Sequence, residues 1–223
     1  MVTRLLKSLK YLLLCGLCVA CTTEENFPDM GTKFNGVVSI KNISIGGQNY
    51  MLALSSDYDR SYNKGSIQVL QANDGSAEPE KLMMLELPRL GRTIDTYDKY
   101  ALVTYDAEDR NSFGTVELYR FDSTTTSSLV KSWTLDCSPT NAVFSGTGNY
   151  LAISCFGGTM YAGVMSETDE SSIVINKVRD YNMNLRAMHF YKSGNSEVLF
   201  AFPAIYQYPV SYTHLTLPTI CSV

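Results

Sequence analysis

The chain has 223 residues, of which 45% are hydrophobic and 18% are charged, and its net charge is −4. This composition is ordinary for a globular protein with a core, and the length allows one or two domains. Removing Met1–Ala20 takes away three of the 18 basic residues and none of the 22 acidic ones, so the remainder carries a net charge of −7. The acidic balance argues against nucleic acid as a partner, because binding nucleic acid needs a basic surface.

Residues 1–20 have the layout of a secretory signal peptide. Three basic residues precede an apolar run at 11–20, which is too short to span a bilayer as a stable helix. The run ends in Cys18-Val19-Ala20-Cys21, which resembles the lipobox of bacterial lipoproteins. The resemblance implies that Cys21 is lipidated, although the lipobox usually has Leu where Cys18 stands. Cleavage without lipidation is the alternative.

The residues after Cys21 predict a flexible tether at 21–34. Two threonines and two glutamates follow Cys21, which resembles the surface-export signal of Bacteroidota lipoproteins, although a solvated tether is also polar and acidic. We therefore expect attachment to the outer membrane through the lipid, in a periplasmic or surface-exposed position. Cys15, Cys18 and Cys21 have a spacing known from metal sites, but they lie in a discarded apolar segment without His or carboxylate. No metal site and no cofactor is expected there.

A repeat with an interval of about 50 residues organises the rest of the chain. Tyr50, Tyr100 and Tyr150 begin the related segments YMLALSS, YALVTYD and YLAISCF, and Glu197–Phe202 (EVLFAF) is a looser copy. Repeats of this length are typical of propeller blades or solenoid coils. The nearly continuous apolar runs predict strands that are buried on both faces, as between packed blades.

Strand and turn patterns predict four-stranded meander units at about 35–88, 89–136 and 137–184, and an incomplete unit at 185–209. The first two units have expected strands at 35–45, 50–55, 66–71, 81–87, 92–96, 100–105, 115–121 and 131–135. In the third unit, 139–154 reads as strand, turn and strand, and 172–178 as the third strand. The fourth unit has expected strands at 185–190 and 197–202.

Residues 139–154 (PTNAVFSGTGNYLAIS) resemble the strand, turn and strand of WD40-like and YncE-like (YVTN-type) propellers. The resemblance implies an all-β fold, a β-propeller of four-stranded antiparallel blades, with about four of an expected six to eight blades present in 35–209. The lipobox, the repeat and the missing catalytic motifs favour a lipid-anchored binding or scaffolding module of the cell envelope with a protein, peptide or glycan ligand. The alternative is a propeller enzyme of the lactonase or quinone-dehydrogenase kind with its site in the missing blades. A purely structural surface protein is a third reading.

The carboxyl end does not read as native sequence. Val210–Thr219 (VSYTHLTLPT) resembles, codon for codon, a translated transposase-type sequencing adaptor. We therefore treat 210–223 as an artefact and expect the native protein to continue beyond about Pro209.

The residues that suggest chemistry are few. Asp57 and Asp59 align with Asp106 and Glu108 in the loop after the second strand, and alternating carboxylates can bind calcium. Such residues more often cap turns, and neither loop has the full EF-type ligand series. His189 has no recognisable partner, and no known catalytic motif is present, so no catalytic residue is assigned.

Three further side chains have two readings each. Trp133, with the many tyrosines, suits a carbohydrate or peptide groove, but at strand positions aromatic rings more often pack between sheets. Cys137 and Cys155 would meet an oxidising compartment after export, which permits a disulfide. Counted back from the turn at 146–149, the two cysteines do not fall opposite one another, which slightly favours unpaired thiols.

Overall fold

The computed structural model describes residues 36–56, 64–72, 78–105, 113–166, 168–181, 183–194, 196–203 and 213–216. In this part of the chain the protein is all β, as predicted: strands alternate with turns, and the only helix is one 3-10 turn, η1 (Glu170–Ser172). All of these elements belong to one compact unit, Thr32–Val223. No helix among the described residues is long and apolar enough to cross a membrane.

Sheets 1 and 2 are four-stranded antiparallel meanders in which each strand pairs with the next one in the chain. Sheet 1 contains β1 (Val37–Ile45), β2 (Gln48–Ser56), β3 (Gly65–Gln71) and β4 (Glu80–Glu86). Sheet 2 contains β5 (Gly91–Tyr97), β6 (Tyr100–Tyr105), β7 (Gly114–Ser123) and β8 (Thr126–Leu135). The strand expected at 131–135 begins earlier, at Thr126, and β-branched threonine suits such an edge strand.

Sheets 3 and 4 continue the same order. Sheet 3 contains β9 (Pro139–Phe144), β10 (Tyr150–Cys155), β11 (Thr159–Val164) and β12 (Ile175–Asp180). Sheet 4 contains β13 (Leu185–Ser193), β14 (Ser196–Pro203) and β15 (Thr213–Thr216), so one described strand lies in the segment that resembles an adaptor.

The prediction for the third unit was wrong in one respect. The segment expected at 172–178 as the third strand is the fourth strand, β12, and the third strand is β11, which the sequence reading missed. The signal for β11 is weak because its sequence, TMYAGV, is short and follows β10 after a tight turn at Phe156–Gly158.

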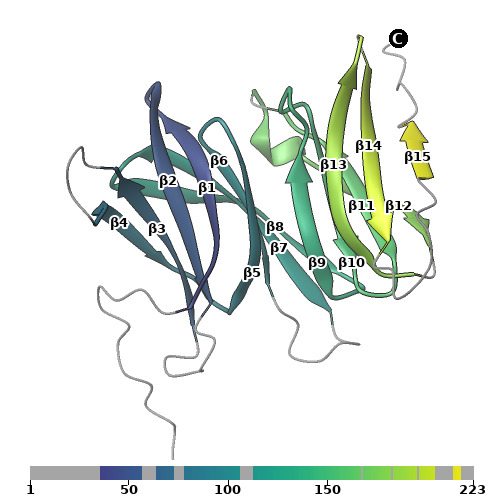
Figure 1. The fold of residues 1–223 in the computed structure, drawn as a ribbon, viewed down its shortest axis with the longest axis horizontal. Coiled ribbons are helices and arrows are strands. Elements are labelled where there is room, and N and C mark those ends of the chain that lie inside the picture. Colours follow the sequence, from purple (N-terminus) through teal and green to yellow (C-terminus); the bar gives the residue numbers. More distant parts are fainter. Residues whose placement is uncertain are drawn as a thin grey trace, which may run out of the picture. The chain divides into compact units, whose positions relative to one another are not determined.

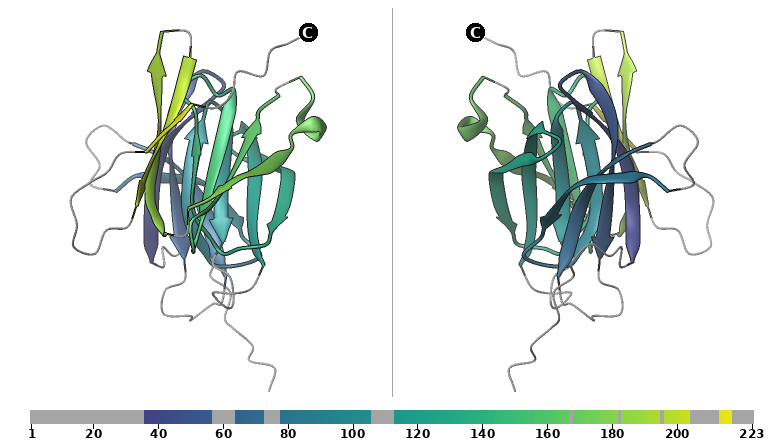
Figure 2. Two further views of the ribbon diagram at one scale, coloured as in Figure 1. Left: turned by 90° about the vertical axis from the view of Figure 1, so that its right-hand side faces the viewer. Right: turned by 90° about the vertical axis from the view of Figure 1, so that its left-hand side faces the viewer.

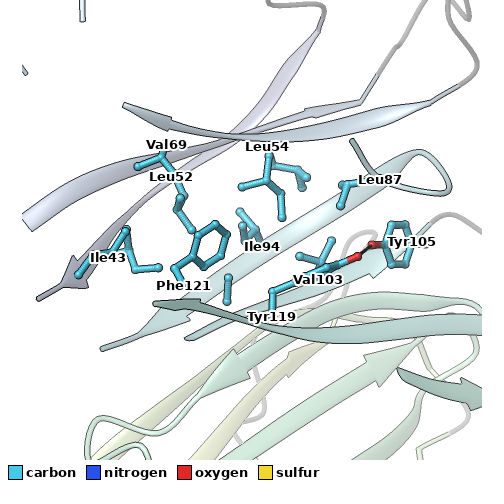
Figure 3. Close-up of a cluster of buried hydrophobic side chains, with 13 residues drawn as sticks. Ile43, Leu52, Leu54, Val69, Leu87, Ile94, Val103, Tyr105, Tyr119 and Phe121 are labelled. Atoms are coloured by element: carbon cyan, nitrogen blue, oxygen red, sulfur yellow. Dashed lines mark hydrogen bonds between the residues drawn. The ribbon is translucent and has the colours of Figure 1, made fainter. Parts of the chain in front are cut away.

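The four sheets pack face to face in chain order, with a core between each successive pair. The first core joins sheets 1 and 2, and Figure 3 shows Leu52 and Leu54 directed toward Ile94, Val103 and Phe121. The second core joins sheets 2 and 3, and the third joins sheets 3 and 4. None of the described sheets closes on itself.

Alternation along the second strand of each sheet explains this stacking. Ala101, Val103 and Tyr105 of β6 belong to the core shared with sheet 1, whereas Tyr100 and Leu102 belong to the core shared with sheet 3. All five side chains are at most 1% exposed. Successive side chains of a strand point to opposite faces, so the prediction of strands buried on both faces is confirmed for β6.

The first strands of the sheets are neighbours: β1 lies beside β5, β5 beside β9, and β9 beside β13. In Figure 1, β9 and β13 run in the same direction, and Figure 2 shows these strands from two further sides. The turns that end the four first strands therefore lie at one end of the stack, which we call the hairpin end. The chain enters β1 at the opposite end, called here the Gly36 end, where Ser56 N donates to Gly36 O at 3.0 Å.

Candidate functional site

Asp95 connects the first strands of three sheets. One carboxylate oxygen accepts from Lys41 Nζ of β1 at 2.9 Å, and the other accepts from the backbone N–H of Phe144 in β9 at 2.8 Å. On the same edge, Thr96 Oγ1 donates to Asn42 O at 2.6 Å. Asp95 is only 17% exposed, whereas Lys41 is 43% exposed. The row of first strands is therefore a polar edge that is held together internally and offers an amine to solvent.

The hairpin end is bonded from sheet to sheet as well. Ser44 N donates to Asp98 O at 3.0 Å, and this links sheet 1 to sheet 2. Glu197 of sheet 4 accepts from Thr147 N at 3.0 Å and from Thr147 Oγ1 at 2.6 Å, in the β9–β10 turn of sheet 3. Together with the Asp95 contacts, these bonds join all four sheets at the end where their first strands turn back.

A buried carboxylate lies between sheets 1 and 2. Glu117 Oε2 accepts from the hydroxyls of Tyr105 at 2.6 Å and Tyr119 at 2.5 Å, and the two hydroxyls are 3.0 Å apart. Figure 3 shows the two rings meeting at their oxygen atoms. Burial, and then the bond to Glu117, raises the pKa of both phenols well above the usual value, so both stay protonated donors at neutral pH. These hydrogen bonds join β6 and β7 within sheet 2, and the carboxylate has its partners there.

A second carboxylate fastens the β11–β12 connection to sheet 2. Glu170 of η1 accepts from Arg120 Nη1 at 2.6 Å and from the Tyr100 hydroxyl at 2.7 Å. Burial works to raise the pKa of Glu170, but the bonds from Arg120 and Tyr100 outweigh it and leave the pKa below its usual value. Glu170 therefore remains ionised at neutral pH and holds the connection in place.

Most of the residues singled out in the sequence lie outside the described residues: Cys21 and the carboxylates Asp57, Asp59, Asp106 and Glu108. Within the described ranges there is no group of three or more His, Cys, Asp or Glu side chains that would hold a metal ion. His189 is on β13, where its side chain is exposed and pairs in register with Phe200. Trp133 is partly buried and packs against the second core, so it follows the packing reading.

Cys137 and Cys155 form a disulfide, with their Cα atoms 5.8 Å apart. The preference for unpaired thiols was wrong, because counting from the turn assumes an unbroken ladder. The register of β9 and β10 shifts between Ser154 and Cys155, and Cys155 pairs with Pro139. This shift brings Cys155 close to Cys137, which precedes β9.

Sequence reasoning missed the two carboxylate clusters. Glu117 is one of few charged residues in a strand of otherwise apolar and aromatic character, TVELYRF, and it shares a face with Tyr119. That pattern is a usable signal for a buried carboxylate with a phenol partner. Glu170 lies in a connection without periodicity, and its partners Arg120 and Tyr100 are distant in sequence, so no local pattern indicates the contact.

No protein-family model matches this chain, and no curated protein matches it in sequence.

Proposed function

We propose that this chain is part of a lipid-anchored protein of the bacterial outer membrane, that its sheets are blades of a β-propeller, and that the propeller is a binding or scaffolding module. The observation that carries the proposal is the repeated arrangement of the four sheets. Each follows chain order, each packs face to face on the next, and the first strands lie side by side. Propeller blades around a central channel have these relations.

The polar edge of first strands is the surface that we assign to a ligand. In a propeller the first strands line the central channel. Here this edge carries the ion pair of Lys41 and Asp95 next to Ile40, which is 57% exposed. An edge with charged, hydrogen-bonding and apolar groups suits a protein, peptide or glycan ligand.

Two features of the chain, its leader and its disulfide, support export from the cytoplasm. The basic and apolar leader and the lipobox-like sequence before Cys21 support secretion and lipidation. The Cys137–Cys155 disulfide fits this location, because structural disulfides persist in oxidising compartments and are rare in the cytosol.

The propeller proposal also needs further blades. The match of Val210–Thr219 to an adaptor supports a native chain that continues beyond about Pro209. About four blades are present here, and propellers usually have six to eight, so additional repeats would supply the remaining blades.

The lipid anchor is tested by mass spectrometry of the protein purified from bacterial membranes. We expect the mature chain to begin at Cys21 with the mass of an attached diacylglycerol and fatty acid. Cys21→Ala should lose this mass and leave the membrane fraction or stay unprocessed. Cys15→Ala is the matched control, because Cys15 lies in the proposed leader and outside the lipobox-like sequence, and it should be lipidated normally. Lipid found on neither variant nor wild type would refute the anchor.

A further inference from the structure

Large apolar side chains gather at the Gly36 end of the stack. Phe113 is 66% exposed, Phe156 42% and Met183 51%, and they stand just before β7, just after β10 and just before β13. Val37 and Val38, at the start of β1, are 43% and 40% exposed. Five of the 11 large apolar side chains that the described residues expose therefore lie at this end, and a group of such side chains on one surface is a mark of an interaction site.

The segments that carry the three largest of these side chains are joined directly. Gly114 N, next to Phe113, donates to Cys137 O at 2.9 Å, and Phe156 N donates to Ser138 O at 2.7 Å. Gly157 N donates to the side chain of Asn184, next to Met183, at 2.6 Å. Phe113, Phe156 and Met183 therefore belong to one surface that crosses from sheet 2 to the start of sheet 4. We call it the apolar end surface.

Two ion pairs lie at this end among the described residues. Lys64 forms an ion pair with Glu86, and Lys177 forms one with Asp180 at 3.0 Å. A paired charge costs less desolvation free energy than an isolated charge when the surface approaches an apolar medium.

The link between the proposed lipid anchor and the sheets is short. The chain enters the sheets at Gly36, at the same end as the apolar end surface. In the proposed lipoprotein only residues 22–35 separate the lipidated Cys21 from Gly36, and such a stretch reaches at most roughly 50 Å when fully extended. A short link keeps the effective concentration of the bilayer high at this end, so even a weak apolar surface would stay engaged.

We propose that the apolar end surface docks on the lipid bilayer to which the protein is anchored, with Phe113, Phe156 and Met183 entering the headgroup region. The inference rests on the lipid anchor of the proposed function. Aromatic and aliphatic side chains enter this region readily, and a lipid chain plus a second membrane contact gives more stable attachment than one lipid chain alone. The hairpin end and the polar edge of first strands then remain available to a ligand.

Trp133 provides the readout, because it is the single tryptophan of the chain and lies on β8 opposite Val116, near the Gly36 end. The purified lipidated protein is reconstituted into vesicles of phosphatidylethanolamine and phosphatidylglycerol with and without brominated acyl chains. Bromine quenches indole fluorescence only at short range. We expect quenching of Trp133 in the wild type, and a fall of about twofold or more when Phe113→Ser and Phe156→Ser remove two apolar contacts.

Leu129→Ser is the matched control, because Leu129 is 52% exposed on the same strand as Trp133 but lies toward the hairpin end. It should leave quenching unchanged. Flotation of the same vesicles separates the two proposals. Protein that floats without quenching, or that is quenched equally in the double variant, contradicts the docking and leaves the anchor intact. Protein that does not float refutes the anchor and the docking together.

Discussion

Asp95 shows how one side chain joins three sheets. Its carboxylate is mostly buried and serves as the acceptor for the Phe144 N–H while it pairs with Lys41. A buried N–H that loses its acceptor costs more free energy than an exposed ion pair contributes. The contact to Phe144 is therefore the more valuable of the two.

Asp95→Ala should lower the free energy of unfolding by about 1–3 kcal/mol, because it leaves the Phe144 N–H without its acceptor. Asp95→Asn keeps an acceptor and should cost less. Lys41→Met should cost less than about 1 kcal/mol, since Lys41 is largely exposed. Urea denaturation of the three purified variants measures these values. An equal loss for Lys41→Met and Asp95→Ala would contradict this ranking.

The Tyr161 hydroxyl makes the stability of the protein depend on pH. Burial, and then the hydrogen bond that its hydroxyl donates to Asp136, raises its pKa from 10.0 to about 12. Folding therefore favours the protonated phenol. The stabilisation is complete below pH 10, the value for the unfolded chain, and is lost as the pH rises to about 12.

Tyr161→Phe should accordingly lose less stability than the wild type between about pH 10 and about pH 12. Tyr191→Phe is the control, because Tyr191 is 57% exposed, and it should follow the wild type. Chemical denaturation at a series of pH values gives the two slopes. A Tyr161→Phe slope as steep as that of the wild type would show that the hydroxyl does not carry this dependence.

At the scale of the elements, the close approach of β7 to the start of β9 depends on a glycine. A Cβ atom on Gly114 would lie 2.0 Å from Pro139 Cδ and 2.5 Å from Cys137 O. Gly114→Ala should therefore destabilise the protein by about 1–3 kcal/mol through overpacking. Gly146→Ala is matched, because its nearest neighbour would be Glu197 Oε1 at 3.9 Å, and its effect should be small. Thermal unfolding of both variants measures these effects. A Gly114→Ala variant as stable as the wild type would contradict the packing of sheets 2 and 3.

The disulfide closes an 18-residue separation within sheet 3. A bond across a loop of this size contributes about 3 kcal/mol, mainly by restricting the unfolded chain. Reductant should lower the free energy of unfolding of the wild type by roughly this amount and should not affect the Cys137→Ala/Cys155→Ala double variant. Denaturation with and without reductant measures it, and a gain of two hydrogens in mass confirms reduction. Wild type that is insensitive to reductant and already carries two thiols would refute the pairing.

Some elements can be predicted from the sequence alone and others cannot. The apolar runs after Tyr50, Tyr100 and Tyr150 predict β2, β6 and β10, because strands buried on both faces leave a strong local signal. β11 was not predicted, since a short strand after a tight turn has little hydrophobic pattern. The disulfide depends on a register shift, and the contacts of Glu117 with Tyr105 and of Glu170 with Arg120 join segments that are apart in sequence. A periodicity argument contains none of these.

At the scale of the whole molecule, the proposed protein combines a repeated stack of sheets with a lipid anchor that precedes Gly36 in the chain. The stack provides two distinct ends and one polar edge. The apolar end surface is assigned to the bilayer, and the polar edge of first strands is assigned to a ligand. A propeller with this arrangement requires further blades after sheet 4 in the native protein.

The most direct test is to sequence the gene locus past the codon for Pro209 with reads that span this point. We expect the reading frame to continue in place of Val210–Val223, with further tyrosine-led strand repeats at an interval of about 50 residues, to a total of about six to eight units. A frame that ends within a few codons of Pro209, or that continues without such repeats, would contradict the propeller and leave an open β-assembly in its place.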